Sequence, residues 1–165
     1  MKSLSTALLL CLTLLIISPA AIAGNCKDVH ANVGAIVDFY DASDCPDQEW
    51  LYDGCLLAPV NGTLNGDWWY YFYGWNAVYV LDPIPGHPGF ESGWAFSAFV
   101  TNKGELWTRD SWIADLEDTD DYGFISQVLV IIGGTGVYEG ATGRLGWVGT
   151  DASGVGRIVG HICTE

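Results

Sequence analysis

An aliphatic strand that runs directly into a glycine-rich segment constrains this chain more than any other feature. Residues 128–132 are uninterrupted Val, Leu and Ile, and the eleven residues from Gly133 to Gly143 contain five glycines. Glycine in a helix interior costs about 1 kcal/mol relative to alanine, so this segment is a poor start for a helix. Glycine does supply the positive φ angles and close backbone contacts of a sharp turn. The run therefore predicts strand, turn and strand, and it favours an all-β domain.

Strand-like segments separated by turn residues continue along the rest of the chain. Asn61-Gly62, Asn65-Gly66 and Asn102-Lys103-Gly104 are typical of tight turns, and no segment after residue 24 has helical periodicity. Eight or nine short strands predict an antiparallel sandwich or a closed barrel, and a barrel leaves no exposed sheet edge. The expected strands are 34–40, 50–57, 68–75 with a continuation to 81, 93–101, 105–115, 125–132, 144–150 and 155–163.

The first 23 residues have the pattern of a secretory signal peptide. Lys2 provides a positive start, residues 7–17 are apolar, and Ala21-Ile22-Ala23 is a small-x-small cleavage site. The apolar stretch is shorter than the ~20 residues of a membrane span. We therefore expect a signal peptide over 1–23 and one mature domain over 24–165. The mature chain is expected to be secreted, or periplasmic in a bacterial host, with no membrane contact; an uncleaved anchor is the alternative.

Four cysteines remain after the expected cleavage: Cys26, Cys45, Cys55 and Cys163. An even number in an exported chain predicts disulfides, for which three pairings are possible. If Cys45 pairs with Cys55 across a short loop, Cys26 and Cys163 join the two ends of the domain. Closing that long loop should stabilise the fold by roughly 4 kcal/mol. The spacing does not match a zinc site.

The chain is strongly acidic, with a formal net charge of −14. This charge repels the phosphates of nucleic acids and anionic lipids, so we expect no nucleic-acid partner, and its steering of cationic partners is an alternative role. Asp118, Asp120 and Gly123 fit an EF-hand loop, but Tyr122 and Leu129 occupy positions that need ligands. We interpret the acidic segment as a solvated loop and expect no metal.

The glycine run is part of a longer motif. A hydrophobic strand is followed by Gly-Gly-Thr-Gly, then by an aromatic residue two positions on, and the motif ends at Gly140-Ala141. Its residues, with the last strand 157–163, resemble the allene oxide cyclase-like and dirigent-like β-barrel superfamily, although Thr142 stands where an arginine is frequent. The resemblance implies an eight-stranded antiparallel barrel whose end is shaped by the motif, with Tyr138 packed against it. The motif residues are Gly133, Gly134, Thr135, Gly136, Tyr138 and Gly140.

The resemblance also implies a function, namely confinement of a small apolar molecule without a cofactor. Members of the superfamily include a cyclase and proteins that steer coupling reactions, so isomerase, cyclase or dirigent-like activity and a homo-oligomer are expectations. A nucleotide-binding interpretation of Gly134-x-Gly136 fails, because Glu139 stands where a glycine is needed and no helix follows. The alternative is a non-catalytic secreted protein that binds glycans or a partner through the aromatic residues of 68–75.

Alternation divides each of the expected strands 93–101 and 105–115 into two faces. If one face lines the barrel, Arg109 becomes a buried charge that needs a partner, and Glu105 on the same face is the expected one. These two residues are the weak catalytic candidates; on an outward face they would form a surface ion pair. The ligand-binding candidates of this face are Trp94, Phe96, Trp107 and Arg109. The opposite face of the second strand carries Leu106, Thr108, Asp110, Trp112 and Ala114.

Overall fold

A computed structural model describes residues 24–46, 53–72, 90–115, 123–150 and 153–164. The expected signal peptide, the proline-rich segment 83–89 and the acidic segment 116–122 lie outside these residues. Among the residues described, no helix is long and apolar enough to cross a membrane. The strands are β1 Asn25–Val33, β2 Asp38–Asp41, β3 Gly54–Gly62, β4 Gly66–Phe72, β5 Phe90–Thr101, β6 Gly104–Asp115, β7 Phe124–Gly134, β8 Thr142–Thr150 and β9 Gly156–Thr164.

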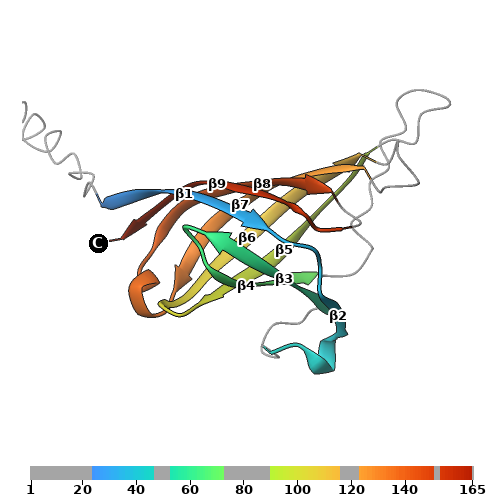
Figure 1. Cartoon of the computed structure of the whole chain (residues 1–165), viewed down its shortest axis with the longest axis horizontal. Coiled ribbons are helices and arrows are strands. Elements are labelled where there is room, and N and C mark those ends of the chain that lie inside the picture. The colour runs from blue at the N-terminus through green and yellow to red at the C-terminus, as the bar shows by residue number, and fades with distance from the viewer. Residues whose placement is uncertain (1–23, 47–52, 73–89, 116–122, 151–152, 165) are drawn as a thin grey trace, which may run out of the picture.

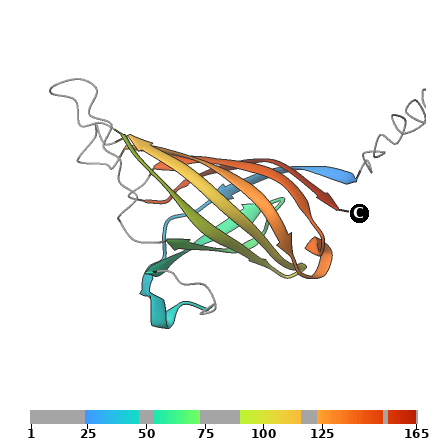
Figure 2. The same cartoon turned by 180° about the vertical axis from the view of Figure 1, so that it is seen from behind.

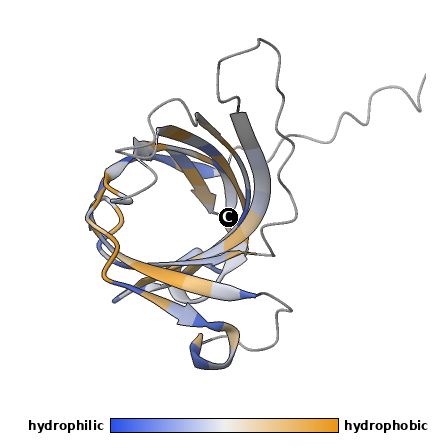
Figure 3. Ribbon diagram, turned by 90° about the vertical axis from the view of Figure 1, so that its right-hand side faces the viewer, coloured by the Kyte–Doolittle hydropathy of each residue, from blue (hydrophilic) through white to orange (hydrophobic). Residues whose placement is uncertain are grey.

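The strands form one antiparallel sheet that closes on itself. Its order is β1-β9-β8-β7-β6-β5-β4-β3, and β1 also pairs with β3, which completes the ring. Figure 1 labels these strands, and Figure 3 looks along the resulting barrel. The prediction of an eight-stranded antiparallel barrel is therefore confirmed. Closure removes the free edges that would otherwise invite aggregation.

The N-terminal strands differ from the sequence prediction. The predicted strand 34–40 is in fact a break at 34–37 followed by β2, and β1 precedes it. In β1 the polar residues His30 and Asn32 alternate with buried valine and alanine. The strand therefore contains no continuous aliphatic run by which it could be predicted. Both β1 and β2 pair with β3, at Val60–Gly62 and Gly54–Leu57 respectively.

The glycine run forms the strand, turn and strand that its composition predicts. Between β7 and β8 the chain makes a 3-10 turn, η3 Gly136–Tyr138. Gly136 has φ of 60°, and a Cβ there would clash with the carbonyl oxygen of Lys103. Tyr138 is buried in the main core. The turn thus plugs one end of the barrel, and this position requires glycine.

Replacing Gly136 with alanine is expected to lower the free energy of unfolding by about 2–4 kcal/mol, because the added Cβ meets backbone at a positive φ. Gly146→Ala is the matched control. A Cβ at Gly146 has no neighbour closer than 3.8 Å, so the change should stay within about 0.5 kcal/mol. Urea unfolding of both variants measures this difference, and equal midpoints would contradict the structural role of the turn.

Two disulfides form, with the pairing that joins the ends of the domain. Cys26 of β1 pairs with Cys163 of β9, and Cys45 pairs with Cys55 of β3. The second disulfide ties β2 and the 3-10 turn η1 Ala42–Asp44 to the barrel wall. Figures 1 and 2 show β2 and η1 lying outside that wall.

Buried side chains form two clusters on opposite sides of the wall. The larger cluster lies inside the barrel and includes Trp68, Phe99 and Trp147. The smaller one lies outside, where the Cys45–Cys55 disulfide covers Tyr71 and Ala98. Both faces of β4 are therefore apolar, which explains why aromatic residues occupy successive positions in it. Trp68 and Tyr70 point inward.

Candidate functional site

The inward face of β6 is the one that carries Asp110. Leu106, Thr108 and Asp110 are each fully buried, whereas Arg109 between them is exposed. In β5 the fully buried residues are Ala95, Ser97 and Phe99, and these point into the barrel. The face that carries Trp107 and Arg109 is the one expected to line the barrel. It lies on the outer surface of the barrel instead, and the structure corrects that hypothesis.

The ligand-binding candidates all lie on this outer surface. Trp94 is 50% exposed, and Phe96 and Trp107 pack against the outer cluster beside the disulfide-tied segment. These aromatics resemble interior residues in the sequence because the covering segment buries part of the outer wall. Arg109, the fourth candidate, faces solvent.

The two weak catalytic candidates do not form a pair. Glu105 accepts a hydrogen bond from the indole Nε1 of Trp107 at 3.0 Å. In the part of the chain that the structure describes, no ion pair joins Glu105 to Arg109. The structure therefore does not bring these residues together as a catalytic unit.

The barrel interior instead holds a buried carboxyl group with two hydroxyl donors. Thr108 Oγ1 donates to Asp110 Oδ1 at 2.6 Å, and Ser97 Oγ donates to Asp110 Oδ2. All three side chains have no exposed surface. Burial raises the pKa of Asp110 to about 7, while the two hydrogen bonds oppose this shift. The carboxyl group can thus hold or release a proton near neutral pH.

Three further polar atoms inside the barrel have no hydrogen-bond partner among the described residues. They are the indole Nε1 atoms of Trp68 and Trp147 and the amide Oε1 of Gln127. Gln127 pairs directly with Trp147 on one side and with Trp112, two residues above Asp110, on the other. The rings of Trp68 and Trp147 lie 5.5 Å apart. Two donors and one acceptor therefore face the same interior as the carboxyl group, and Gln127 lies on the strand next to the one that carries it.

Glycines in the wall make room for the large rings. A Cβ at Gly93 would lie 2.6 Å from the ring of Trp112, and one at Gly156 would lie 2.6 Å from Nε1 of Trp147. The indoles lie flat against these glycines because no side chain intervenes. Pairing large with small residues is how narrow barrels fill their interiors. Gly156 therefore helps to determine where the indole N–H of Trp147 lies.

The arrangement can bind and exchange protons with a neutral polar group. The indole N–H groups donate, Gln127 Oε1 accepts, and Asp110 does either according to its protonation state. A carboxyl group with a pKa near 7 suits a general acid or base at physiological pH. Within the described ranges no group of three His, Cys, Asp or Glu residues is placed to hold a metal ion.

Comparisons with known proteins identified no relative of this chain. No family model, no curated protein and no solved structure matched the chain. The likeness to the allene oxide cyclase-like and dirigent-like superfamily therefore stays a prediction from the motif residues.

Sequence reasoning did not select Asp110, Ser97 or Gln127 as site residues. A signal was present, because the Asp110 face of β6 carries one charge among apolar residues while the opposite face carries both Glu105 and Arg109. Choosing the face with fewer charges as the interior would have identified Asp110. Nothing in the local sequence of β7 distinguishes Gln127 from a surface glutamine.

Proposed function

We propose that the barrel binds a small, largely apolar molecule that carries one hydroxyl or carbonyl group. The observation that supports this best is the buried carboxyl of Asp110, held by Ser97 and Thr108 in a largely apolar interior. Burying a carboxyl group costs free energy even when it is hydrogen-bonded, and groups whose pKa is strongly raised by burial are concentrated at functional sites.

The unpartnered polar atoms inside the barrel support the same proposal. A buried donor or acceptor without a partner costs about 1–3 kcal/mol, and the described residues place three such atoms in this interior. A hydroxyl or carbonyl group of a ligand would satisfy the indole N–H groups or Gln127 Oε1 and recover that free energy. The apolar body of the ligand would contact the aliphatic and aromatic side chains of the main cluster. Rigid strands hold all these groups, so little ordering is needed on binding.

Proton transfer to or from the ligand is the chemical step open to Asp110. With a pKa near 7 the group gives up or accepts a proton at similar cost. An isomerase or cyclase activity, in which the barrel holds a reactive molecule in one conformation, would use that capacity. Neutralising Asp110 would then abolish turnover while leaving part of the binding.

We further propose that the protein acts outside the cell. The N-terminal pattern is that of a signal peptide, and both disulfides belong to an oxidising compartment.

A second candidate function is binding of a partner or glycan on the outer wall. Trp94, Val128 and Val159 occupy one row across β5, β7 and β9, and each is more than 40% exposed. Exposed apolar rows of this kind are typical of interaction surfaces, including those between copies of one chain. A ligand lost on Trp94→Ala would favour this candidate over the interior.

Native mass spectrometry of the secreted protein from its own host tests the interior proposal. We expect a co-purified ligand whose occupancy falls several-fold in Ser97→Ala, because Asp110 loses a hydrogen bond there. Ser111→Ala removes the same hydroxyl from the outer face of β6 and should leave occupancy unchanged. Equal occupancy in both variants would contradict an interior site.

A further inference from the structure

The closed end of the barrel has a pocket that combines two lysines with an apolar floor. Its volume is about 150 Å³. The residues that line it are Asn25, Lys27, Val29, Thr63, Leu64, Lys103, Val137, Tyr138, Ile162 and Thr164. We propose that this pocket binds a small organic carboxylate with an apolar body, at a site separate from the one around Asp110.

Both lysines of the chain after residue 2 lie at this pocket. The three arginines of the expected mature chain, Arg109, Arg144 and Arg157, are exposed on the outer wall and do not line it. In a protein with a net charge of −14, gathering two cations at one small pocket creates a local site for an anion. Among the described residues that line the pocket, none carries a carboxylate.

The fold directs Lys27 toward the pocket. Lys27 shares its face of β1 with Val29, which is inside the barrel, and pairs with Ile162 of β9. The adjacent Cys26–Cys163 disulfide holds these two strand ends together. Asp28 points to the opposite face of β1, because side chains alternate along a strand.

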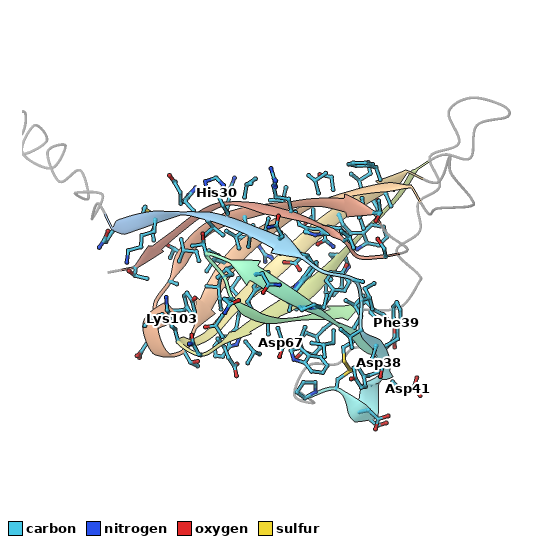
Figure 4. All side chains as sticks on the ribbon, viewed as in Figure 1. His30, Asp38, Phe39, Asp41, Asp67 and Lys103 are labelled. Atoms are coloured by element: carbon cyan, nitrogen blue, oxygen red, sulfur yellow. A yellow bond between two sulfur atoms is a disulfide. The ribbon has the colours of Figure 1, made fainter. Side chains whose placement is uncertain are left out.

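Lys103 is positioned from the other side by backbone hydrogen bonds. Its carbonyl oxygen accepts from the N–H of Val137 at 3.0 Å, and its own N–H donates to Thr101 Oγ1 at 3.1 Å. These bonds tie the β5–β6 turn to η3, beside which Figure 4 labels Lys103. The lysine therefore stands at the rim of the end that Tyr138 plugs.

The floor of the pocket sets the size and chemistry of the ligand. Val29, Leu64 and Ile162 are buried below the rim. A cavity of about 150 Å³ holds a molecule of about the size of benzene. An aromatic or short aliphatic carboxylate would place its body on this floor and its charge between the lysines. Thr63 is not counted as a further donor to the anion, because its hydroxyl already donates to the carbonyl oxygen of His30 at 3.1 Å.

Titration of the ¹⁵N-labelled protein with benzoate, followed by NMR at low salt, tests the proposal. We expect millimolar binding, with the largest shifts at the amides of Lys27, Lys103 and Val137. Lys27→Gln and Lys103→Gln should each weaken binding by about 2- to 5-fold. Arg144→Gln removes one positive charge from the outer wall and should leave the affinity unchanged.

Two controls distinguish carboxylate binding in this pocket from uncharged hydrophobic binding and from binding in the barrel interior. Benzamide has the same shape as benzoate without the charge, and it should bind more weakly; equal binding of the two would overturn the proposal. Asp110→Asn should not change benzoate binding; a loss in that variant would place the ligand in the interior and also overturn the proposal. Equal weakening by Arg144→Gln, or no shift at about ten times the expected dissociation constant, would overturn it as well.

Discussion

Raising the pH from about 4 to about 8 is expected to lower the free energy of unfolding by up to about 4 kcal/mol through the single carboxyl group of Asp110. In the folded protein its pKa is raised to about 7 by burial, whereas its ordinary value is 3.8. Between these values the folded protein retains a proton that the unfolded chain has released. This contribution to stability is complete below pH 4 and is lost as the pH rises to 7.

Urea unfolding at several pH values, on the protein and on Asp110→Asn, measures this contribution. The variant cannot ionise at residue 110, so its stability should fall less over the same range. Repulsion among the other carboxylates is common to both proteins and cancels in the difference. Asp67→Asn, an exposed change on β4, should keep the pH dependence of the original protein. Parallel curves for the original protein and Asp110→Asn would show that the carboxyl is not desolvated.

Removing the Cys26–Cys163 disulfide is expected to lower the free energy of unfolding by about 4–5 kcal/mol. The bond joins residues 137 apart, so without it the unfolded chain gains the entropy of a very long open loop. A loss of this size is comparable to the whole stability of a marginal domain. The Cys26→Ser/Cys163→Ser variant should therefore be partly unfolded at 37 °C.

The matched control for this variant is Cys45→Ser/Cys55→Ser. Its disulfide closes a loop of sequence separation 10, and its loss should cost about 2.5 kcal/mol. Circular dichroism during thermal unfolding gives both values. A larger loss for the short loop would mean that its packing against Tyr71, and not chain entropy, dominates.

The barrel follows from the sequence because its signals are local. The glycine run dictates a turn between β7 and β8, and the strands from β5 to β9 begin within about three residues of their predicted starts. The pairing of Cys45 with Cys55 is favoured by their short separation. β1 is not predicted, because its outer face is polar and because it pairs with β3 and β9, which are distant in the sequence.

The candidate site is less predictable, because its location depends on which face of each strand is inside. In β5 and β6 both faces are rich in apolar residues, since β2 and η1 cover part of the outer wall around Tyr71 and Phe96. The packing of β2 and η1 on the wall is a tertiary contact held by the Cys45–Cys55 disulfide, and no local sequence pattern predicts it. The lower number of charges on the Asp110 face of β6 is consequently the one sequence signal that this residue points inward.

Titration of the Asp110 carboxyl carbon by ¹³C NMR tests the interior site most directly. The resonance is assigned by its loss in Asp110→Asn, and the titration runs from about pH 3 to about pH 9. We expect one aspartate with a midpoint near pH 7, and a shift of that midpoint when a hydroxyl- or carbonyl-bearing ligand occupies the barrel. A midpoint near 4 for Asp110 would contradict a desolvated carboxyl inside the barrel, and with it the proposed binding site.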